Sequence, residues 1–232
     1  MKVFRFQQFE IQQSKSVFRV GTDAVLLGVL SYVDGSKSVL EVGTGTGIIS
    51  LMLAQRNSEA QFLALDIDPN AVELSSLNFK NSPFCDRMEV LEMDFNEFKS
   101  DQKFDLIVSN PPYFEVSDSE KDKKARQMIL LNFEQLISKS APLLQENGIL
   151  SLVVPYDVTD KLNEIAEFNK LYLVRKVSVI GIEGGEPKRV ILEYSKIIKS
   201  LKEETFVVES APRVYSEQYI QATKNFHLFK YN

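Results

Sequence analysis

The stretch Asn110-Pro111-Pro112-Tyr113 holds residue types that suit a specific kind of chemistry. It follows an apolar run at 104–109 that is typical of a buried strand, and two consecutive prolines must end that strand. The Asn110 side-chain oxygen and the Pro111 carbonyl could accept the two hydrogens of an exocyclic amino group, while Tyr113 could stack on its plane. A plain strand-ending turn would explain the same four residues, so the motif alone leaves both interpretations open.

A glycine-rich loop follows the predicted strand at 38–42 and consists of Gly43, Thr44, Gly45, Thr46 and Gly47. Glycines let the backbone turn tightly and approach a ligand closely. A dinucleotide-binding fingerprint would end in a further glycine, but Ile48 follows this loop, which disfavours a pyrophosphate ligand. Glu41, just before the loop, suits a cationic ligand better than a pyrophosphate. S-adenosylmethionine carries an amino group and a sulfonium, and it has a ribose as well.

Two further acids follow the next two predicted strands. Asp66 comes about 20 residues after the loop, where an acid can accept hydrogen bonds from both ribose hydroxyls. Asp94 is expected to end the third strand and could accept from an adenine amino group. The carboxyl ends of strands are where open parallel sheets bind ligands. Each acid alone could be a helix cap or a solvated turn, but the ordered set favours an S-adenosylmethionine site.

An alternation of strands and helices must position these residues. The predicted strands are 38–42, 61–65, 88–92, 104–109, 148–154, 171–180 and 189–197, and the predicted helices between them are 47–55, 69–81, 132–144 and 158–168. Such alternation predicts parallel strands with helices on both faces, and the last two strands are too close for a crossover helix, so they should form an antiparallel hairpin.

The two ends of the chain add smaller elements. Residues 4–11 predict a strand or hairpin outside the main sheet, and 24–32 predict a helix that Thr22 or Asp23 could cap. A short strand at 205–209 and a helix at 216–226 follow the core. We expect a single domain over 1–232, divided into an N-terminal extension (1–37), a catalytic core (38–198) and a C-terminal extension (199–232).

The composition excludes several classes of protein. Of 232 residues, 44% are hydrophobic, and the net charge of −5 argues against a general nucleic-acid coat protein. Cys85 is the only cysteine and His227 the only histidine, so zinc sites of several such ligands are excluded and no metal is expected. The single cysteine fits a reducing compartment, no apolar run approaches the roughly 18 residues of a membrane span, and no signal peptide is recognised. We expect a cytoplasmic protein.

The glycine loop with Asp66, Asp94 and Asn110 resembles the class I S-adenosylmethionine-dependent methyltransferases over about 38–197. This resemblance implies a Rossmann-like α/β fold with a mostly parallel seven-stranded sheet, an antiparallel C-terminal hairpin and helices on both faces. It implies S-adenosyl-L-methionine as cofactor, bound by Thr22, Asp23, Glu41, Gly43, Thr44, Gly45, Gly47, Asp66, Ile67, Asp94, Phe95 and Asn110. The catalytic residues would be Asn110, Pro111, Pro112 and Tyr113.

The Asn-Pro-Pro-Tyr motif resembles the subgroup of these enzymes that methylates planar amino or amide nitrogens. An aromatic amino group is a poor nucleophile because its lone pair is delocalised, and acceptors at Asn110 and Pro111 would direct that lone pair toward the methyl group. No strong general base is required. A nucleic-acid base would have to be flipped out or already unstacked to reach Tyr113.

Three acceptors fit this motif: a base in RNA, a base in DNA and a glutamine amide of a protein. The flanking segments 9–11, 20–28, 125–126, 187–193 and 215–226 resemble the bacterial tRNA1(Val) (adenine-N6)-methyltransferase family. That resemblance implies N6-methylation of adenine 37, the base 3′ to the anticodon, with a valine tRNA as partner. A release-factor glutamine, an rRNA base and a catalytically silent cofactor-binding module remain alternatives.

Two groups of basic residues are candidates for contacts with tRNA: Lys121, Lys123, Lys124 and Arg126 in one, and Lys188 and Arg189 in the other. We expect the first group to form a mobile lid that meets the tRNA backbone. We also expect the helix that begins near Thr22 to close over the cofactor or to line the base pocket. A solvated face is the alternative for each basic group.

Overall fold

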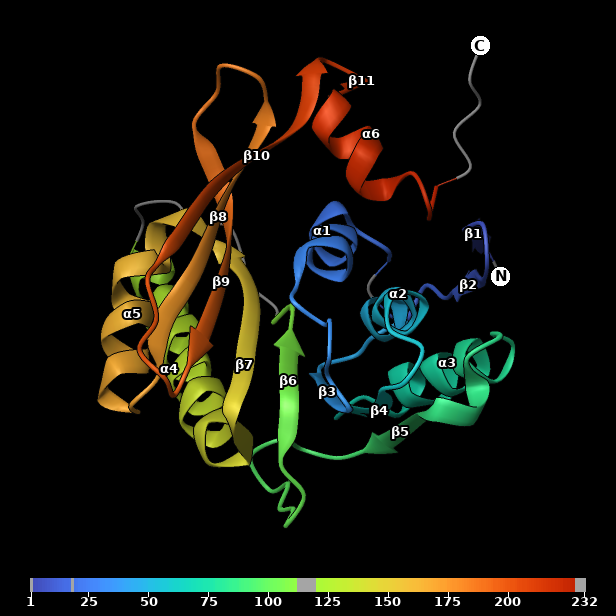
Figure 1. Ribbon diagram of the computed structural model, residues 1–232, viewed down its shortest axis with the longest axis horizontal. Coiled ribbons are helices and arrows are strands. Elements are labelled where there is room, and N and C mark those ends of the chain that lie inside the picture. The colour runs from blue at the N-terminus through green and yellow to red at the C-terminus, as the bar shows by residue number, and fades with distance from the viewer. Residues whose placement is uncertain (1, 18, 112–119, 228–232) are drawn as a thin grey trace.

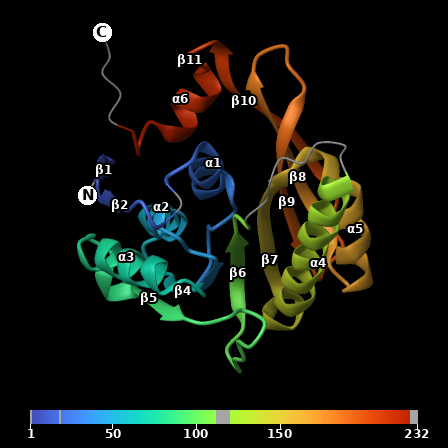
Figure 2. The same ribbon diagram turned by 180° about the vertical axis from the view of Figure 1, so that it is seen from behind.

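A computed structural model shows a nine-stranded sheet with helices on both of its faces (Figures 1 and 2). It describes residues 2–17, 19–111 and 120–227, and within α4 it describes side chains from residue 132 onward. The strands of this sheet are β3 (Ser38–Val42), β4 (Gln61–Asp66), β5 (Met88–Glu92), β6 (Phe104–Ser109), β7 (Leu144–Pro155), β8 (Tyr172–Ile182), β9 (Pro187–Ser195), β10 (Lys202–Ala211) and β11 (Val214–Tyr215). The helices are α1 (Thr22–Leu30), α2 (Ile48–Arg56), α3 (Pro69–Lys80), α4 (Glu120–Leu143), α5 (Thr159–Phe168) and α6 (Glu217–Thr223), with 3-10 turns η1 (Cys85–Arg87) and η2 (Tyr156–Val158).

The topology confirms the predicted fold class. The strand order is β11-β10-β8-β9-β7-β6-β3-β4-β5. Strands β3 to β7 pair in parallel, and β9 is antiparallel to both β7 and β8, as the predicted hairpin requires. Parallel strands buried on both faces carry nearly continuous apolar runs, as β6 does at 106–108 and β7 does at 149–154.

The sheet is wider than the seven strands that the sequence predicted, because β10 pairs in parallel with β8 and β11 pairs with β10. Charged residues open β10, but they form ion pairs with β8: Arg175 Nε lies 2.7 Å from Glu204 Oε1. Phe206 and Val208 then alternate into the core. The predicted short strand at 205–209 lies within β10, but residues 202–204, which cross-strand charge pairs hold, lack the apolar signal on which our prediction relied.

Helix α6 covers the outer edge of β10. The Gln218 side chain accepts a hydrogen bond from the Val207 N–H (2.8 Å) and donates one to the Thr205 carbonyl (3.0 Å). Ser216 Oγ donates to the Val207 carbonyl at 2.5 Å. Side chains of the C-terminal segment therefore satisfy backbone groups of the outermost long strand.

Several predicted boundaries differ from the structure. Helix α4 begins at Glu120 rather than at residue 132, because every residue of 120–131 except one aspartate and one isoleucine is a good helix former: glutamate, lysine, alanine, arginine, glutamine, methionine or leucine. Strand β5 ends at Glu92, so Asp94 lies in the following loop rather than at the strand end. The N-cap of α1 is Gly21, which makes no side-chain cap, rather than Thr22 or Asp23.

The predicted N-terminal hairpin is confirmed as a separate two-stranded sheet of β1 (Lys2–Arg5) and β2 (Glu10–Gln13). It is fixed on α3 by Asn78, whose Oδ1 accepts from the Gln12 N–H at 2.8 Å and whose Nδ2 donates to the Gln12 carbonyl at 3.2 Å. Asn78 Nδ2 also donates to the Thr46 carbonyl at 2.8 Å. One buried amide therefore joins the hairpin to the glycine loop.

Two large hydrophobic clusters form most of the core, and a small third one contains Val17 and Ala71. The first contains Leu27 of α1, Leu51 of α2 and Phe79 of α3. The second contains Phe133 of α4 and Leu162 of α5. Figures 1 and 2 show α1, α2 and α3 on one face of the sheet and α4 and α5 on the other. The sheet is thus buried on both faces, and its carboxyl edge is the place left for a ligand.

The last turn of α1 is held by two arginines from neighbouring elements. Arg56 Nη1 donates to the Gly28 carbonyl at 2.9 Å and to the Ser31 carbonyl at 2.8 Å. Arg175 Nη1 donates to the Leu30 carbonyl at 2.6 Å. These cations satisfy carbonyls that a helix end leaves free and suit the negative end of its dipole. The opposite end of α1 is thereby positioned at the carboxyl edge of the sheet.

Candidate functional site

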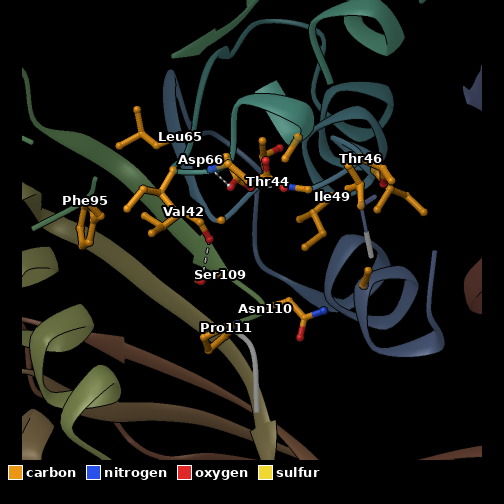
Figure 3. A pocket seen from close by; sticks show the side chains of 18 of the residues that line it. Val42, Thr44, Thr46, Ile49, Leu65, Asp66, Phe95, Ser109, Asn110 and Pro111 are labelled. Carbon is orange, nitrogen blue, oxygen red and sulfur yellow. Dashed lines mark hydrogen bonds between the residues drawn. The ribbon is translucent and has the colours of Figure 1, made fainter. Parts of the chain in front are cut away.

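A cavity of about 760 Å³ opens at the carboxyl ends of β3, β4 and β6 (Figure 3). This volume is within the roughly 300–1,000 Å³ typical of small-molecule sites. The described residues that line it include ten of the predicted site residues: Asp23, Gly43, Thr44, Gly45, Asp66, Ile67, Asp94, Phe95, Asn110 and Pro111. The fold therefore brings residues from five separate segments of the chain to one hollow.

Glycine is required in the loop for two different structural reasons. Gly43 and Gly45 have positive φ angles of 74° and 55°, and a Cβ at either position would meet no atom within 4 Å. They leave open space beside the cavity, which a bound ligand can fill. Gly47, with φ 79°, does not line the cavity. Its missing Cβ makes room for Phe79, whose Cε1 would lie 2.4 Å from it.

Asp66 stabilises the glycine loop and keeps acceptor capacity for a ligand. Its Oδ2 accepts from the Gly45 N–H at 2.8 Å, and its Oδ1 accepts from the Asp68 N–H at 3.0 Å. An ionised carboxylate has about four acceptor positions, so two remain. Asp66 can therefore accept from a diol while it fixes the loop against which that diol would rest.

Glu41 is fully buried behind the glycine loop and does not line the cavity directly. Its Oε2 accepts from Thr44 Oγ1 at 2.9 Å, and from the Ser50 N–H at 3.1 Å and hydroxyl. Its Oε1 is buried without a hydrogen-bond partner among the described residues. Burial is the main reason that the pKa of Glu41 rises to about 7, against the lowering effect of the Ser50 and Thr44 hydrogen bonds.

The orphaned oxygen of Glu41 is an observation that fits a cationic ligand. A buried acceptor without a donor costs about 1–3 kcal/mol, more for a charged group. An ammonium or sulfonium held over the loop would favour the ionised form and lower this cost. The open glycine cradle, the free acceptors of Asp66 and this oxygen together fit S-adenosylmethionine.

The other end of the cavity lies between the loop after β5 and helix α4. Asp94 Oδ1 accepts from the Asn96 N–H at 2.8 Å, which shapes this loop. Asn132, Gln135 and Leu136 of α4 also line the cavity, and they are not among the predicted site residues. Their spacing of three and four residues places them on one helix face, and this spacing is the only sequence feature that could have indicated that they act together.

Asn110 and Pro111 directly follow β6, and both line the cavity. Figure 3 shows the Asn110 side chain extending into the space between the glycine loop and α1. Ser109 Oγ donates to a carbonyl of β3 at 2.7 Å, which fixes the strand end just before Asn110. Pro112 and Tyr113, the other predicted catalytic residues, lie outside the described residues.

The predicted tRNA-binding residues fall in two places. Arg189 on β9 forms an ion pair with Asp23 of α1 (Nε–Oδ2, 3.2 Å), which joins a predicted RNA-binding residue to the cavity wall. Lys188 beside it is exposed, as is Thr22, which does not line the cavity. Along the first turns of α4, where side chains are not described, lie Lys121, Lys123, Lys124 and Arg126.

Neither a membrane span nor a metal site is found in the part of the chain that the structure describes. No helix there is long and apolar enough to cross a membrane. No group of three or more histidine, cysteine, aspartate or glutamate side chains there is arranged to hold a metal ion.

The fold and the site together define a methyltransferase of the Rossmann-like class. A predicted O-methyltransferase from Agrobacterium tumefaciens, protein Atu636, has the same fold, with a TM-score of 0.70 at 17% identity over 88% of this chain and 96% of that one. The family model "Methyltransferase small domain" matches residues 13–178.

Curated relatives narrow the class further. A tRNA1(Val) (adenine(37)-N6)-methyltransferase from Flavobacteriaceae bacterium (strain 3519-10) is 50% identical over 99% of this chain and 100% of its own length. One of the same name from Bacteroides thetaiotaomicron is 40% identical over 97% of both chains. The chain belongs to the tRNA1(Val) (adenine(37)-N6)-methyltransferase family.

Proposed function

We propose that this protein transfers the methyl group of S-adenosylmethionine to N6 of adenine 37 in tRNA1(Val). The observation that carries the proposal is the position of Asn110 and Pro111 on the wall of the same cavity as the glycine loop and its acids. An amino-group acceptor site and a cofactor site meet there. The names of the full-length relatives support adenine 37 of this tRNA as the acceptor.

Each part of the cavity has a proposed role in holding the cofactor. Asp66 accepts from the ribose hydroxyls, and Asp94 with Phe95 holds the adenine. Gly43 and Gly45 provide the open space over which the rest of the molecule lies. When bound, the cofactor supplies an electrophilic methyl group on a sulfonium. Ile67, Thr44 and the first turn of α1 complete the walls.

The protein's own contribution to the reaction is positioning. Asn110 Oδ1 and the Pro111 carbonyl accept the two N6 hydrogens, which turns the nitrogen lone pair toward the methyl carbon. The N–C bond forms as the S–C bond breaks, and the electron pair of the S–C bond remains on sulfur, which becomes a thioether. The methylated amine then loses a proton to water. Pro112 is proposed to keep the Pro111 carbonyl free of competing N–H groups, and Tyr113 to stack on the flipped adenine.

Contacts with the tRNA backbone are proposed for both basic groups, on the first turns of α4 and on β9. Lys188 is exposed on β9, and the ion pair of Arg189 with Asp23 would link RNA contact to the cavity wall. We propose that the chain works as one domain, with the extensions 1–37 and 199–232 packed on the core 38–198. Because tRNA is the proposed substrate, we expect the protein to act in the cytoplasm.

The test is methyl transfer to defined tRNA. Purified protein and S-adenosylmethionine are incubated with an unmodified tRNA1(Val) transcript, and the nucleosides are analysed by mass spectrometry. One N6-methyladenosine per tRNA is expected, and none on a matched transcript with guanosine at position 37. Methylation of a release-factor glutamine without any on tRNA would overturn the proposed substrate, and cofactor binding without transfer to either would overturn the proposed activity.

A further inference from the structure

Charge is unevenly distributed around the cavity. Carboxylates of Asp23, Asp66, Asp68 and Asp94 line it, whereas Arg19 is the only cation among the described residues that do. Arg19 is exposed, and no ion pair joins it to another described residue. A single cation in an acidic cavity marks the place where an anionic group of a ligand can bind.

Arg19 lies in the segment between β2 and α1, of which residues 16, 17 and 19–21 line the cavity. Val17 packs in a buried cluster with Ala71 of α3, which fixes one side of the segment. The Val20 N–H donates to Gln13 Oε1 at 3.2 Å, which fixes the other side. Arg19 is therefore held at the cavity from both directions.

The glycine loop has few free donors for an anion. The N–H groups of Gly43 and Thr44 both donate to the Leu65 carbonyl, at 2.9 and 3.1 Å. The Gly45 N–H donates to Asp66 Oδ2 at 2.8 Å. Backbone N–H groups at such a loop are the usual cradle for anions, and these three are already used. An anionic part of the ligand needs a different partner.

We propose that Arg19 binds the carboxylate of the methionine part of S-adenosylmethionine and so selects cofactors that carry this group. The inference rests on the proposed function, because it takes S-adenosylmethionine as the ligand. A guanidinium fits a carboxylate through two parallel hydrogen bonds. The acids of the cavity suit the hydroxyl, amino and cationic groups of the same molecule and would repel its carboxylate.

Calorimetric titration of wild type and Arg19→Gln with S-adenosylmethionine and with decarboxylated S-adenosylmethionine tests this assignment. Loss of a charge-assisted hydrogen bond at an exposed position should weaken S-adenosylmethionine binding about tenfold. Binding of the decarboxylated analogue should be unchanged. Lys15→Gln removes an exposed cation from the same segment outside the cavity lining and should alter neither affinity.

Equal loss of both ligands by Arg19→Gln, or no loss of either, would overturn the role of Arg19. Arg19→Lys should recover part of the affinity for S-adenosylmethionine alone, since it keeps the charge and loses the paired geometry. A failure of this assignment can be distinguished from a failure of the proposed function. If wild type binds S-adenosylmethionine but does not methylate tRNA, the proposed substrate is wrong and the role of Arg19 is unaffected. If wild type does not bind S-adenosylmethionine, both the proposed function and the role of Arg19 are wrong.

Discussion

Alanine at Gly43 and at Gly47 separates the two reasons for which the loop needs glycine. Both residues have positive φ, so either alanine costs about 1–2 kcal/mol of unfolding free energy through backbone strain. At Gly43 the new Cβ meets no atom within 4 Å, whereas at Gly47 it would lie 2.4 Å from Phe79 Cε1. Overpacking should therefore add roughly 1–3 kcal/mol at Gly47 alone.

Thermal unfolding and calorimetry should rank the two variants in opposite orders. For a chain of this length each 1 kcal/mol lowers Tm by roughly 2–4 °C, so Gly47→Ala should show the larger drop. Gly43→Ala should lose more affinity for S-adenosylhomocysteine, because Gly43 lines the cavity and Gly47 does not.

The double variant Gly47→Ala/Phe79→Leu provides the control for this explanation. The smaller leucine removes the ring atoms nearest the new Cβ, so the double variant should be less destabilised than the two single losses added together. Equal destabilisation by Gly43→Ala and Gly47→Ala, or strict additivity in the double variant, would refute the packing role assigned to Gly47.

Three more outcomes follow from the site. Asn110→Ala should lower turnover about 100- to 1,000-fold, as loss of one oriented hydrogen-bonding group does elsewhere, and leave cofactor affinity nearly intact; equal losses in single-turnover and binding assays would contradict its role. Burial raises the pKa of Glu41 from 4.5 to about 7, so the protonated side chain is the form that stabilises the folded state. As pH rises from 4.5 to 7, the unfolding free energy of ligand-free wild type, measured by chemical denaturation, should fall by up to about 3 kcal/mol relative to that of Glu41→Gln. A difference between the two proteins that does not change with pH would exclude this titration. Alanine at all four of Lys121, Lys123, Lys124 and Arg126 should make the slope of log Kd for tRNA against log salt concentration shallower by about 0.7–0.9 for each phosphate that the protein no longer neutralises. An unchanged slope would exclude these four residues from the RNA interface.

Local turn chemistry explains why much of the fold could be predicted. Strand β6 ends where Pro111 and Pro112 follow, and α3 begins where Pro69 follows Asp68, whose side chain accepts from the Asn70 N–H at 2.9 Å. Such residues act within a few positions of the chain, so the sequence carries their effect. The start of α4, the first residues of β10 and the pairing of β10 with β8 depend on propensity and cross-strand pairing, which hydrophobic periodicity does not show.

The site residues also divide into those that the sequence could predict and those that it could not. The order of the glycines, Asp66, Asp94 and Asn110 along the chain predicted that they meet at one edge of the sheet. The burial of Glu41 behind the loop could not be predicted, because it depends on Ser50 of α2 folding back over the strand end. Arg19 was missed for a similar reason, since its position comes from the docking of the N-terminal hairpin on α3 through Asn78.

The bonding of Gln218 to β10 has a consequence for the behaviour of the protein in solution. An unpaired strand edge is a template on which another chain can add a strand, and aggregation often begins there. The amide of Gln218 takes the place of such a strand by bonding both the Val207 N–H and the Thr205 carbonyl, and Ser216 occupies the Val207 carbonyl. The C-terminal segment thus occupies the outer edge of β10 at residues 205–207, where a strand of another chain could otherwise add.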